Sequence, residues 1–252
     1  MSVEQLQAGL QQLYDQGYCL IDIYELAYKD TDGNYSKKNK ILFPEGKKPL
    51  IISQRDVCYP YGASELGVAE KLVIDGDTVK AQSSLNGKAV NGSYDLVPVV
   101  EDFIKKHPDF SYNGARGVLG VTGYCGVLGY RTSSYLAQEA NNPFAGYGLA
   151  NIETERASAK SVADKLKELG WHFACSGFGS QISYGSEFSI MSSDVLTWKN
   201  EVEPVVGASD IVIFPKMTDI GSWAAYKEDN QKFSLLKENG FSWFLLGENS
   251  TP

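Results

Sequence analysis

The chain has 252 residues, 43% of them hydrophobic and 21% charged, with a formal net charge of −8. This composition is typical of a globular protein that can bury a sizeable core. The acidic balance argues against nucleic-acid partners, because a phosphate backbone is bound by a basic surface. No apolar run approaches the roughly 20 residues that span a bilayer, and residues 1–30 lack the layout of a signal peptide. We therefore expect no membrane span in this chain.

Hydrophobic periodicity predicts alternating helices and strands. Helices are expected at residues 3–16, 95–106, 154–169, 192–203 and 231–239, and strands at 18–21, 49–56, 117–122, 171–175, 211–214 and 241–246. A hairpin insertion is expected near 71–93, with turns at 75–76, 86–87 and 91–92, and a further turn at 32–34. Residues 132–152 predict a long irregular loop. The alternation indicates an α/β class with a parallel sheet, open or closed into a barrel, in one domain over residues 1–252.

Polar side chains follow four of the predicted strands. The clearest case is the apolar run 49–52, which leads directly into Arg55 and Asp56. Segments 116–124, 171–179 and 210–216 repeat this design. In parallel sheets the carboxyl ends of the strands line the functional face, so these four ends are the predicted location of a site. Asp56 is equally compatible with a structural ion pair or helix cap, and its neighbour Arg55 should point to the opposite face of an extended strand.

The residues needed for hydrolytic chemistry are sparse. There are two histidines, and we expect His107 at a helix end and His172 as a core histidine with a satisfied partner. Hydrolytic zinc sites use two or three histidines, and the nucleophile positions Cys175 and Ser176 have no histidine base in reach. The glycine-rich stretch 123–129 lacks the lysine of a phosphate-binding loop. Nucleotide binding and triad catalysis are therefore not expected.

Four cysteines stand far apart in the sequence, at positions 19, 58, 125 and 175. No Cys-x-x-Cys spacing occurs, so the pattern predicts neither a zinc ribbon nor a disulfide framework. The redox state of the cysteines stays open. Five tyrosines, at positions 59, 61, 124, 130 and 184, follow predicted strands. Their rings would line a glycan groove or pack within the loops, and the sequence leaves both interpretations open.

Several short motifs occur in a fixed order between residues 5 and 246. They are YDQGY at 14–18 with DIYEL at 22–26, PEGKKPLIIS at 44–53, HPDFSY at 107–112, TGY at 122–124, LGYRT at 128–132 and LGWHFA at 169–174. In these motifs the sequence resembles the polysaccharide deacetylases of Firmicutes with NodB homology, carbohydrate esterase family 4. The resemblance implies a distorted (β/α) barrel. It also implies a divalent metal, often zinc, that is held by an Asp and two His while another Asp acts as base to hydrolyse acetyl groups.

The resemblance breaks at the catalytic positions. Arg55 stands at the position of the base, Asp56 keeps a ligand position, and Ser176 and Ser180 replace the two histidine ligands. One carboxylate and two hydroxyls would hold zinc weakly. Arginine stays protonated at neutral pH, so Arg55 cannot act as a base and would repel a dication. We therefore expect neither functional catalytic residues nor a metal cofactor.

The resulting expectation is a deacetylase-like domain that has lost its metal site and catalysis and binds a cell-wall or other polysaccharide, at an extracellular or cell-envelope location. The candidate ligand-binding residues are Arg55, Asp56, Tyr124, Arg131, Cys175, Ser176 and Ser180. One alternative is an active metal-dependent N- or O-deacetylase that holds zinc through Asp56 with Cys58 or Cys175. The other is a protein-interaction module without a ligand groove.

Overall fold

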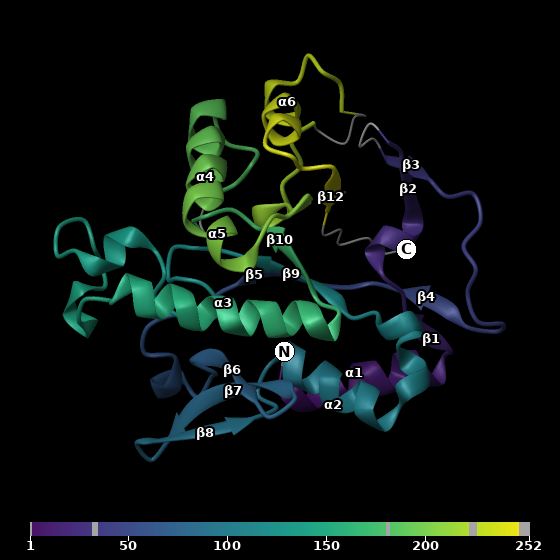
Figure 1. Ribbon diagram of the computed structural model, residues 1–252, viewed down its shortest axis with the longest axis horizontal. Helices are drawn as coiled ribbons and strands as arrows, with labels where there is room; N and C mark the ends of the chain where they lie inside the picture. The colour runs from purple at the N-terminus through teal and green to yellow at the C-terminus, as the bar shows by residue number, and fades with distance from the viewer. Residues whose placement is uncertain (1, 32–34, 180–181, 222–225, 247–252) are drawn as a thin grey trace. The chain divides into compact units, whose positions relative to one another are not determined.

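The computed structural model describes residues 2–31, 35–179, 182–221 and 226–246. Helices and strands alternate through much of the chain, and the α/β class is confirmed (Figure 1). The helices are α1 (Val3–Asp15), α2 (Leu96–Lys106), α3 (Ile152–Leu169), α4 (Phe188–Glu201), α5 (Glu203–Val206) and α6 (Gln231–Glu238). The strands are β1 (Tyr18–Leu20), β2 (Ala27–Lys29), β3 (Tyr35–Lys37), β4 (Lys48–Leu50), β5 (Ile52–Val57), β6 (Lys71–Asp75), β7 (Thr78–Leu85), β8 (Lys88–Gly92), β9 (Gly117–Val121), β10 (His172–Cys175), β11 (Ile211–Ile213) and β12 (Trp243–Leu245).

The largest sheet has five strands in the order β12-β11-β10-β9-β5 and forms a curled, parallel half-barrel. Strands β9 and β11 are buried along their whole length, which explains their continuous apolar sequences. Strand β5 lies at the edge and alternates between covered and exposed residues. The four predicted polar strand ends belong to β5, β9, β10 and β11, which are consecutive neighbours in this sheet.

The chain divides into two compact units. The first comprises residues 1–53, 62–118 and 164–172, and the second comprises residues 54–61, 119–163 and 173–252. Strands β5, β9 and β10 and helix α3 each begin in one unit and end in the other. The expectation of a single folding domain stays a prediction that denaturant unfolding tests.

In the first unit, α1 packs on α2, and α2 packs on the antiparallel meander β6-β7-β8. A capping box starts α1, because the Ser2 hydroxyl accepts the Gln5 N–H while the Gln5 side chain accepts the Ser2 N–H. In α2, the Glu101 carboxylate accepts hydrogen bonds from Arg116 Nε, at 2.7 Å, and from the Trp171 indole N–H, at 2.8 Å. Arg116 and Glu101 are largely buried, so removing one partner would leave the other as a buried charge without its ion pair.

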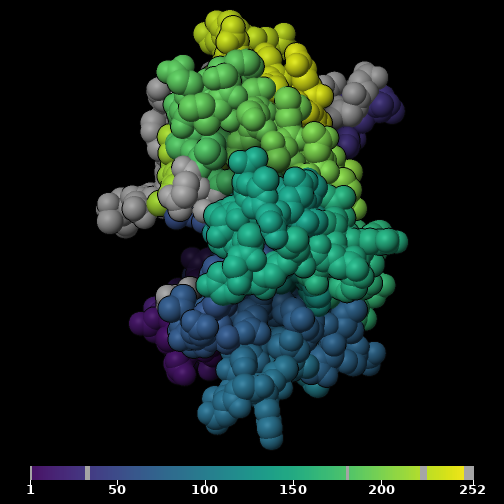
Figure 2. All heavy atoms as spheres, turned by 90° about the vertical axis from the view of Figure 1, so that its left-hand side faces the viewer, coloured from purple at the N-terminus to yellow at the C-terminus, as the bar shows by residue number. Residues whose placement is uncertain are grey.

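In the second unit, α4 packs on α5 and α6. The indole N–H of Trp198 in α4 donates to the Val121 carbonyl at the end of β9, at 2.9 Å. Residues 132–151 contain no α-helix or strand and form two short 3₁₀ turns, Ser134–Ala137 and Ala145–Tyr147. This stretch forms part of the closely packed teal surface in the middle of Figure 2. The irregular loop predicted here is thus confirmed, and it is compact.

Several predicted elements need correction. The single strand expected at 49–56 is two strands, because the ladder breaks at Ile51: β4 pairs with β1, and β5 joins the five-stranded sheet. The turn expected at 91–92 lies inside β8, where Asn91 pairs with Gln82 across the meander. Strands β2 and β3, at the start and within the polar stretch that follows Tyr28, pair in an antiparallel arrangement. The polar composition of this stretch did not predict these strands. Helix α4 starts at Phe188, earlier than the expected residue 192. The turn expected at 32–34 lies outside the described residues.

Among the residues that the structure describes, no helix combines the length and apolar character needed to cross a membrane.

Candidate functional site

The candidate site lies within the second unit, at the carboxyl ends of β5, β9, β10 and β11. Asp56 is its central residue. Its backbone has φ 55°, a left-handed conformation that aspartate tolerates better than most residues. The Asp56 N–H donates to Ser176 Oγ at 3.1 Å, and this hydroxyl is buried directly after β10. Two of the predicted site residues, 120 positions apart, are therefore in contact.

Asp56 has a left-handed backbone at the end of β5, so the chain is no longer extended there. Arg55 and Asp56 are both exposed. The expectation that the two side chains point to opposite faces of the strand stays a prediction. A left-handed backbone conformation costs free energy for a residue other than glycine, and such residues often occur at functional sites.

Two cations act on the Asp56 carboxylate. Partial exclusion of water raises the pKa of Asp56, while the positive charges of Arg55 and Lys216 oppose that rise. Lys216 is exposed and follows β11, and its backbone is also left-handed, with φ 57°. Segment 210–216 is one of the four predicted strand ends, but Lys216 is not among the residues predicted to bind a ligand. No local pattern identified it, because its proximity to Asp56 depends on the sheet.

Arg131 serves mainly as a clamp between loops. Its Nη1 donates to the carbonyls of Tyr59, at 2.7 Å, and Cys125, at 2.6 Å. The guanidinium carbon lies 4.0 Å from the ring centroid of Tyr61, a cation–π contact. The Arg131 backbone N–H donates to Glu155 at 2.6 Å. Most of this side chain's bonding capacity therefore holds the loops after β5 and β9 together, and less remains for a ligand.

The Tyr61 ring is the centre of an aromatic cluster. It stacks on Phe144 with centroids 4.7 Å apart, and the Tyr147 ring lies 4.8 Å away. Tyr147 is 64% exposed, so this cluster presents an aromatic ring to solvent. Of the other tyrosines considered for a groove, Tyr59 and Tyr184 are core residues.

Cys58 and Cys125 lie in the loops after two neighbouring strands, β5 and β9. The proximity of Cys125 lowers the pKa of the Cys58 thiol against the opposing effect of burial, while the proximity of Cys58 and burial raise the pKa of Cys125. Tyr124 lowers the pKa of both thiols, so it lies near them at the predicted site. Both cysteines are free thiols.

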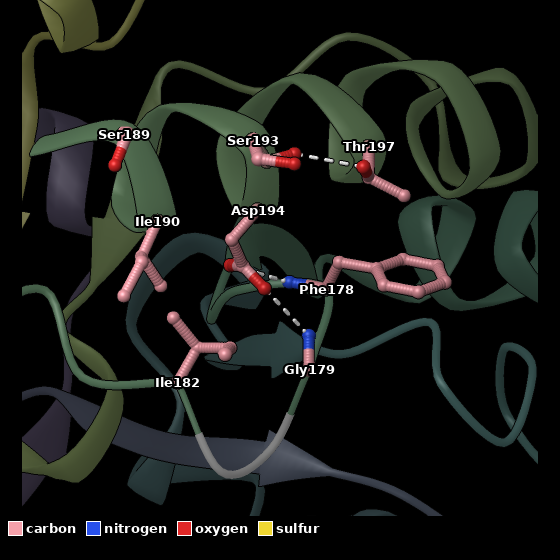
Figure 3. A pocket seen from close by; sticks show the side chains of 8 residues that line it. All are labelled: Phe178, Gly179, Ile182, Ser189, Ile190, Ser193, Asp194 and Thr197. Carbon is pink, nitrogen blue, oxygen red and sulfur yellow. Dashed lines mark hydrogen bonds between the residues drawn. The ribbon is translucent and has the colours of Figure 1, made fainter.

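The loop after β10 is anchored from α4, as Figure 3 shows. The Asp194 carboxylate accepts the N–H groups of Phe178, at 2.9 Å, and Gly179, at 2.8 Å. Burial raises the pKa of Asp194, and the two backbone hydrogen bonds oppose this effect. The depression beside this loop has a volume of about 540 Å³ and an apolar floor formed largely by Phe178, Ile182 and Ile190. Ser180 lies outside the described residues.

Cys175 is not accessible to a ligand. It is fully buried, its thiol lies 3.5 Å from the Tyr184 hydroxyl, and burial raises its pKa to about 12. His172 is also engaged, because its Nε2 contacts Asp22 at 2.7 Å in the first unit. The prediction of a satisfied partner for His172 is therefore confirmed, but its side chain is partly exposed, so the expected core position is wrong. The exposed polar side chains at the strand ends are those of Arg55, Asp56 and Lys216.

The residues at the family's metal positions fit a zinc ion poorly. Asp56 supplies one carboxylate between two cations, and Ser176 supplies a neutral hydroxyl that already accepts a backbone N–H. In the part of the chain that the structure describes, no group of three or more His, Cys, Asp or Glu side chains is placed to hold a metal. Of the two cysteines considered as zinc ligands together with Asp56, Cys58 lies near enough for the Asp56 charge to raise its pKa.

Comparisons with protein-family models, curated proteins and solved structures found no match to this chain. The resemblance of its motifs to polysaccharide deacetylases stays a prediction.

Proposed function

We propose that this chain is a deacetylase-like domain that binds a cell-envelope polysaccharide at its strand-end site without hydrolysing it. The observation that carries the proposal is the pair of exposed cations, Arg55 and Lys216, acting on the Asp56 carboxylate. Two positive charges around one negative charge, in a chain of net charge −8, favour an anionic ligand at this edge. An acidic glycan offers carboxylates for the cations and hydroxyls for Asp56.

The aromatic cluster supplies the second element of a glycan site. Tyr147 presents an exposed ring that lies against the Tyr61 ring, and Arg131 in turn contacts Tyr61. An aromatic ring held in this way offers a flat apolar surface to one face of a sugar at little conformational cost. Arg131 connects this cluster to the Cys125 loop and so to the strand ends. A polysaccharide crossing both features would meet aromatic and cationic contacts in succession.

The curled parallel sheet supports the proposal only at the level of the fold class. We infer that it corresponds to the distorted (β/α) barrel of the deacetylases, in which glycan chains lie across the strand ends. The poor fit of Asp56 and Ser176 to a zinc ion favours binding over hydrolysis.

Affinity electrophoresis against an acidic polysaccharide such as polygalacturonate, and against neutral dextran, tests the binding. We expect retardation in the acidic polymer, and at least about a tenfold loss of affinity in Arg55→Ala/Lys216→Ala, because charge-assisted contacts are worth more than about 1.4 kcal/mol. Tyr147→Ala should weaken binding to a similar degree. The matched control is Lys88→Ala/Tyr94→Ala, which removes an exposed cation and an exposed ring from the first unit.

A second assay separates binding from catalysis. The protein is incubated with zinc, cobalt or manganese, passed through gel filtration, and assayed for metal content and for acetate release from acetylated chito-oligosaccharides. We expect no retained metal and no acetate. Stoichiometric metal together with acetate release that is lost in Asp56→Asn would establish a deacetylase with substituted ligands. If neither glycan binding nor hydrolysis occurs, a protein-interaction module becomes the better interpretation.

A further inference from the structure

The connection between β3 and β4 is positively charged in an acidic chain. Residues 37–48 contain five lysines and one acidic residue, whereas the whole chain has a net charge of −8. This stretch, which we call the basic loop, starts with the last residue of β3 and ends with the first residue of β4 (Figure 1). A local excess of cations on an acidic protein favours an anionic partner at that place.

An apolar run, residues 41–44, lies in the middle of the basic loop. Leu42 is 89% exposed, the highest value for a large hydrophobic residue in the part of the chain that the structure describes. Its neighbour Phe43 is half-buried, and the Phe43 ring packs edge-on against Tyr112 with centroids 5.2 Å apart. A single exposed leucine is common on protein surfaces. Here, however, the leucine belongs to a four-residue apolar run with lysines on both sides, a composition that suits the interface between lipid headgroups and acyl chains.

The two ends of the basic loop are fixed within the first unit. The Lys38 N–H donates to the Leu26 carbonyl at 3.0 Å, and the Lys48 N–H donates to the Gly17 carbonyl at 2.8 Å. A loop that is held at both ends loses less conformational entropy on binding than a free segment does. The apolar run is therefore presented to solvent on a supported loop.

The lysines of the basic loop divide into two groups. Lys38 is ion-paired with Glu25 at 3.0 Å, and Lys47 with Asp109 at 2.8 Å. The exposed lysines are Lys37, Lys40 and Lys48. Each lysine near an anionic bilayer raises the affinity about fivefold. The acidic remainder of the chain opposes this attraction weakly, because physiological salt screens charges over about 8 Å.

We propose that the basic loop docks the protein on the surface of an anionic lipid bilayer. Leu42 and Pro44, both exposed, enter the boundary between headgroups and acyl chains, and the exposed lysines contact the lipid phosphates. A bilayer fits this surface better than a dissolved polyanion, which would engage the lysines and leave Leu42 in water. The basic loop lies in the first unit and the proposed glycan site in the second, so this proposal does not depend on glycan binding.

Sedimentation of the full chain with vesicles tests the proposal. One vesicle is made of phosphatidylcholine alone, and the other contains equal amounts of phosphatidylcholine and phosphatidylglycerol. We expect binding to the anionic vesicle alone, and weaker binding as salt is raised. Leu42→Ser should lower the affinity at least about tenfold, because the apolar contact of the leucine is lost. Lys40→Ala/Lys48→Ala should lower it about twentyfold.

Matched controls remove the same groups elsewhere in the first unit. Leu66→Ser alters a leucine that is 74% exposed, and Lys88→Ala/Lys105→Ala removes two exposed lysines. Both variants should bind vesicles like the wild type. Hydrogen exchange in the presence of the anionic vesicles should slow at the amides of residues 39–43 and 45–46, while the β6-β7-β8 meander keeps its exchange rates.

Three results would overturn the proposal. One is a wild-type protein that does not sediment with the anionic vesicles. Another is an equal loss of binding in Leu42→Ser and Leu66→Ser, which would indicate adsorption without a defined surface. The third is binding to inorganic polyphosphate that is lost in Lys40→Ala/Lys48→Ala but unchanged in Leu42→Ser, together with equal vesicle binding by Leu42→Ser and the wild type. That result would identify a dissolved polyanion as the partner of the basic loop.

Discussion

At the scale of single residues, long-range partners determine what a side chain does. Asp22 caps the turn Ile23–Leu26 by accepting the Tyr24 N–H at 2.9 Å, and it also contacts His172, 150 positions away, at 2.7 Å. Burial raises the pKa of Asp22, but the hydrogen bonds from His172 and from the Tyr24 backbone outweigh it, and the pKa falls below its usual value of 3.8.

This lowered pKa predicts a loss of stability in acid. The contribution of Asp22 is fully present above its unfolded pKa of 3.8 and is lost as the pH falls through the lower folded pKa, because the unfolded chain takes up the proton first. We expect Asp22→Asn to cost about 1 kcal/mol at neutral pH, a modest value for a partly exposed pair. The cost should shrink towards about pH 2, where the wild type has lost the same interaction.

Urea unfolding midpoints of both proteins between about pH 6 and pH 2 measure this difference. Asp77→Asn, at an exposed aspartate of the turn between β6 and β7, is the matched control and should leave the midpoint unchanged at every pH. An Asp22→Asn penalty that stays constant down to the lowest pH would show that packing, and not the carboxylate charge, is responsible.

At the scale of elements, the local sequence pattern predicted the helices and the buried strands well. It predicted poorly those features that depend on which strands pair with each other. The periodic apolar positions of α1 and α3 predicted both helices within about two residues of their ends. The prediction of one strand over residues 49–56 was wrong, because β4 pairs with β1 while β5 pairs in the five-stranded sheet. The break at Ile51 depends on these partners and not on the local sequence. The same limit applies to the site. Arg55, Asp56 and Ser176 were identifiable as strand ends, but the left-handed Asp56 and the position of Lys216 require the assembled sheet.

Helix α4 and the loop after β10 form one structural element through Asp194. Its two carboxylate oxygens accept two backbone N–H groups, of Phe178 and Gly179. In Asp194→Asn one oxygen becomes an amide donor, so one of these N–H groups loses its acceptor. We predict a loss of about 1–3 kcal/mol in unfolding free energy, the usual penalty for an unsatisfied buried group. The loop should also become more open to solvent.

Hydrogen exchange checks this prediction locally. The Phe178 and Gly179 amides should exchange faster in Asp194→Asn, while amides of the β6-β7-β8 meander keep their protection. Ser193→Ala, which alters an exposed side chain at the adjacent position of α4, should change neither stability nor exchange. Equal protection of the loop in both variants would contradict the anchoring role of Asp194.

At the scale of the whole molecule, the chain connectivity argues that the two compact units unfold together. Strands β5, β9 and β10 and helix α3 each contribute residues to both units, so unfolding one unit would break elements that the other requires. If a flexible linker joined the two units, the boundary between them would fall in that linker and not inside a strand or a helix. We therefore predict a single cooperative transition in denaturant, as expected for a chain that forms one domain.

A pair of variants tests this cooperativity, one in each unit. Glu101→Gln weakens the buried pair with Arg116 in the first unit and should cost about 3 kcal/mol, and Asp194→Asn weakens the loop anchor in the second. If the chain unfolds as one domain, each variant moves the entire circular-dichroism curve to lower denaturant with an unchanged slope. The fluorescence of Trp171, in the first unit, and of Trp198, in the second, should change at the same midpoint. Two separate transitions, with Glu101→Gln shifting one and Asp194→Asn the other, would establish two independent domains despite the shared strands.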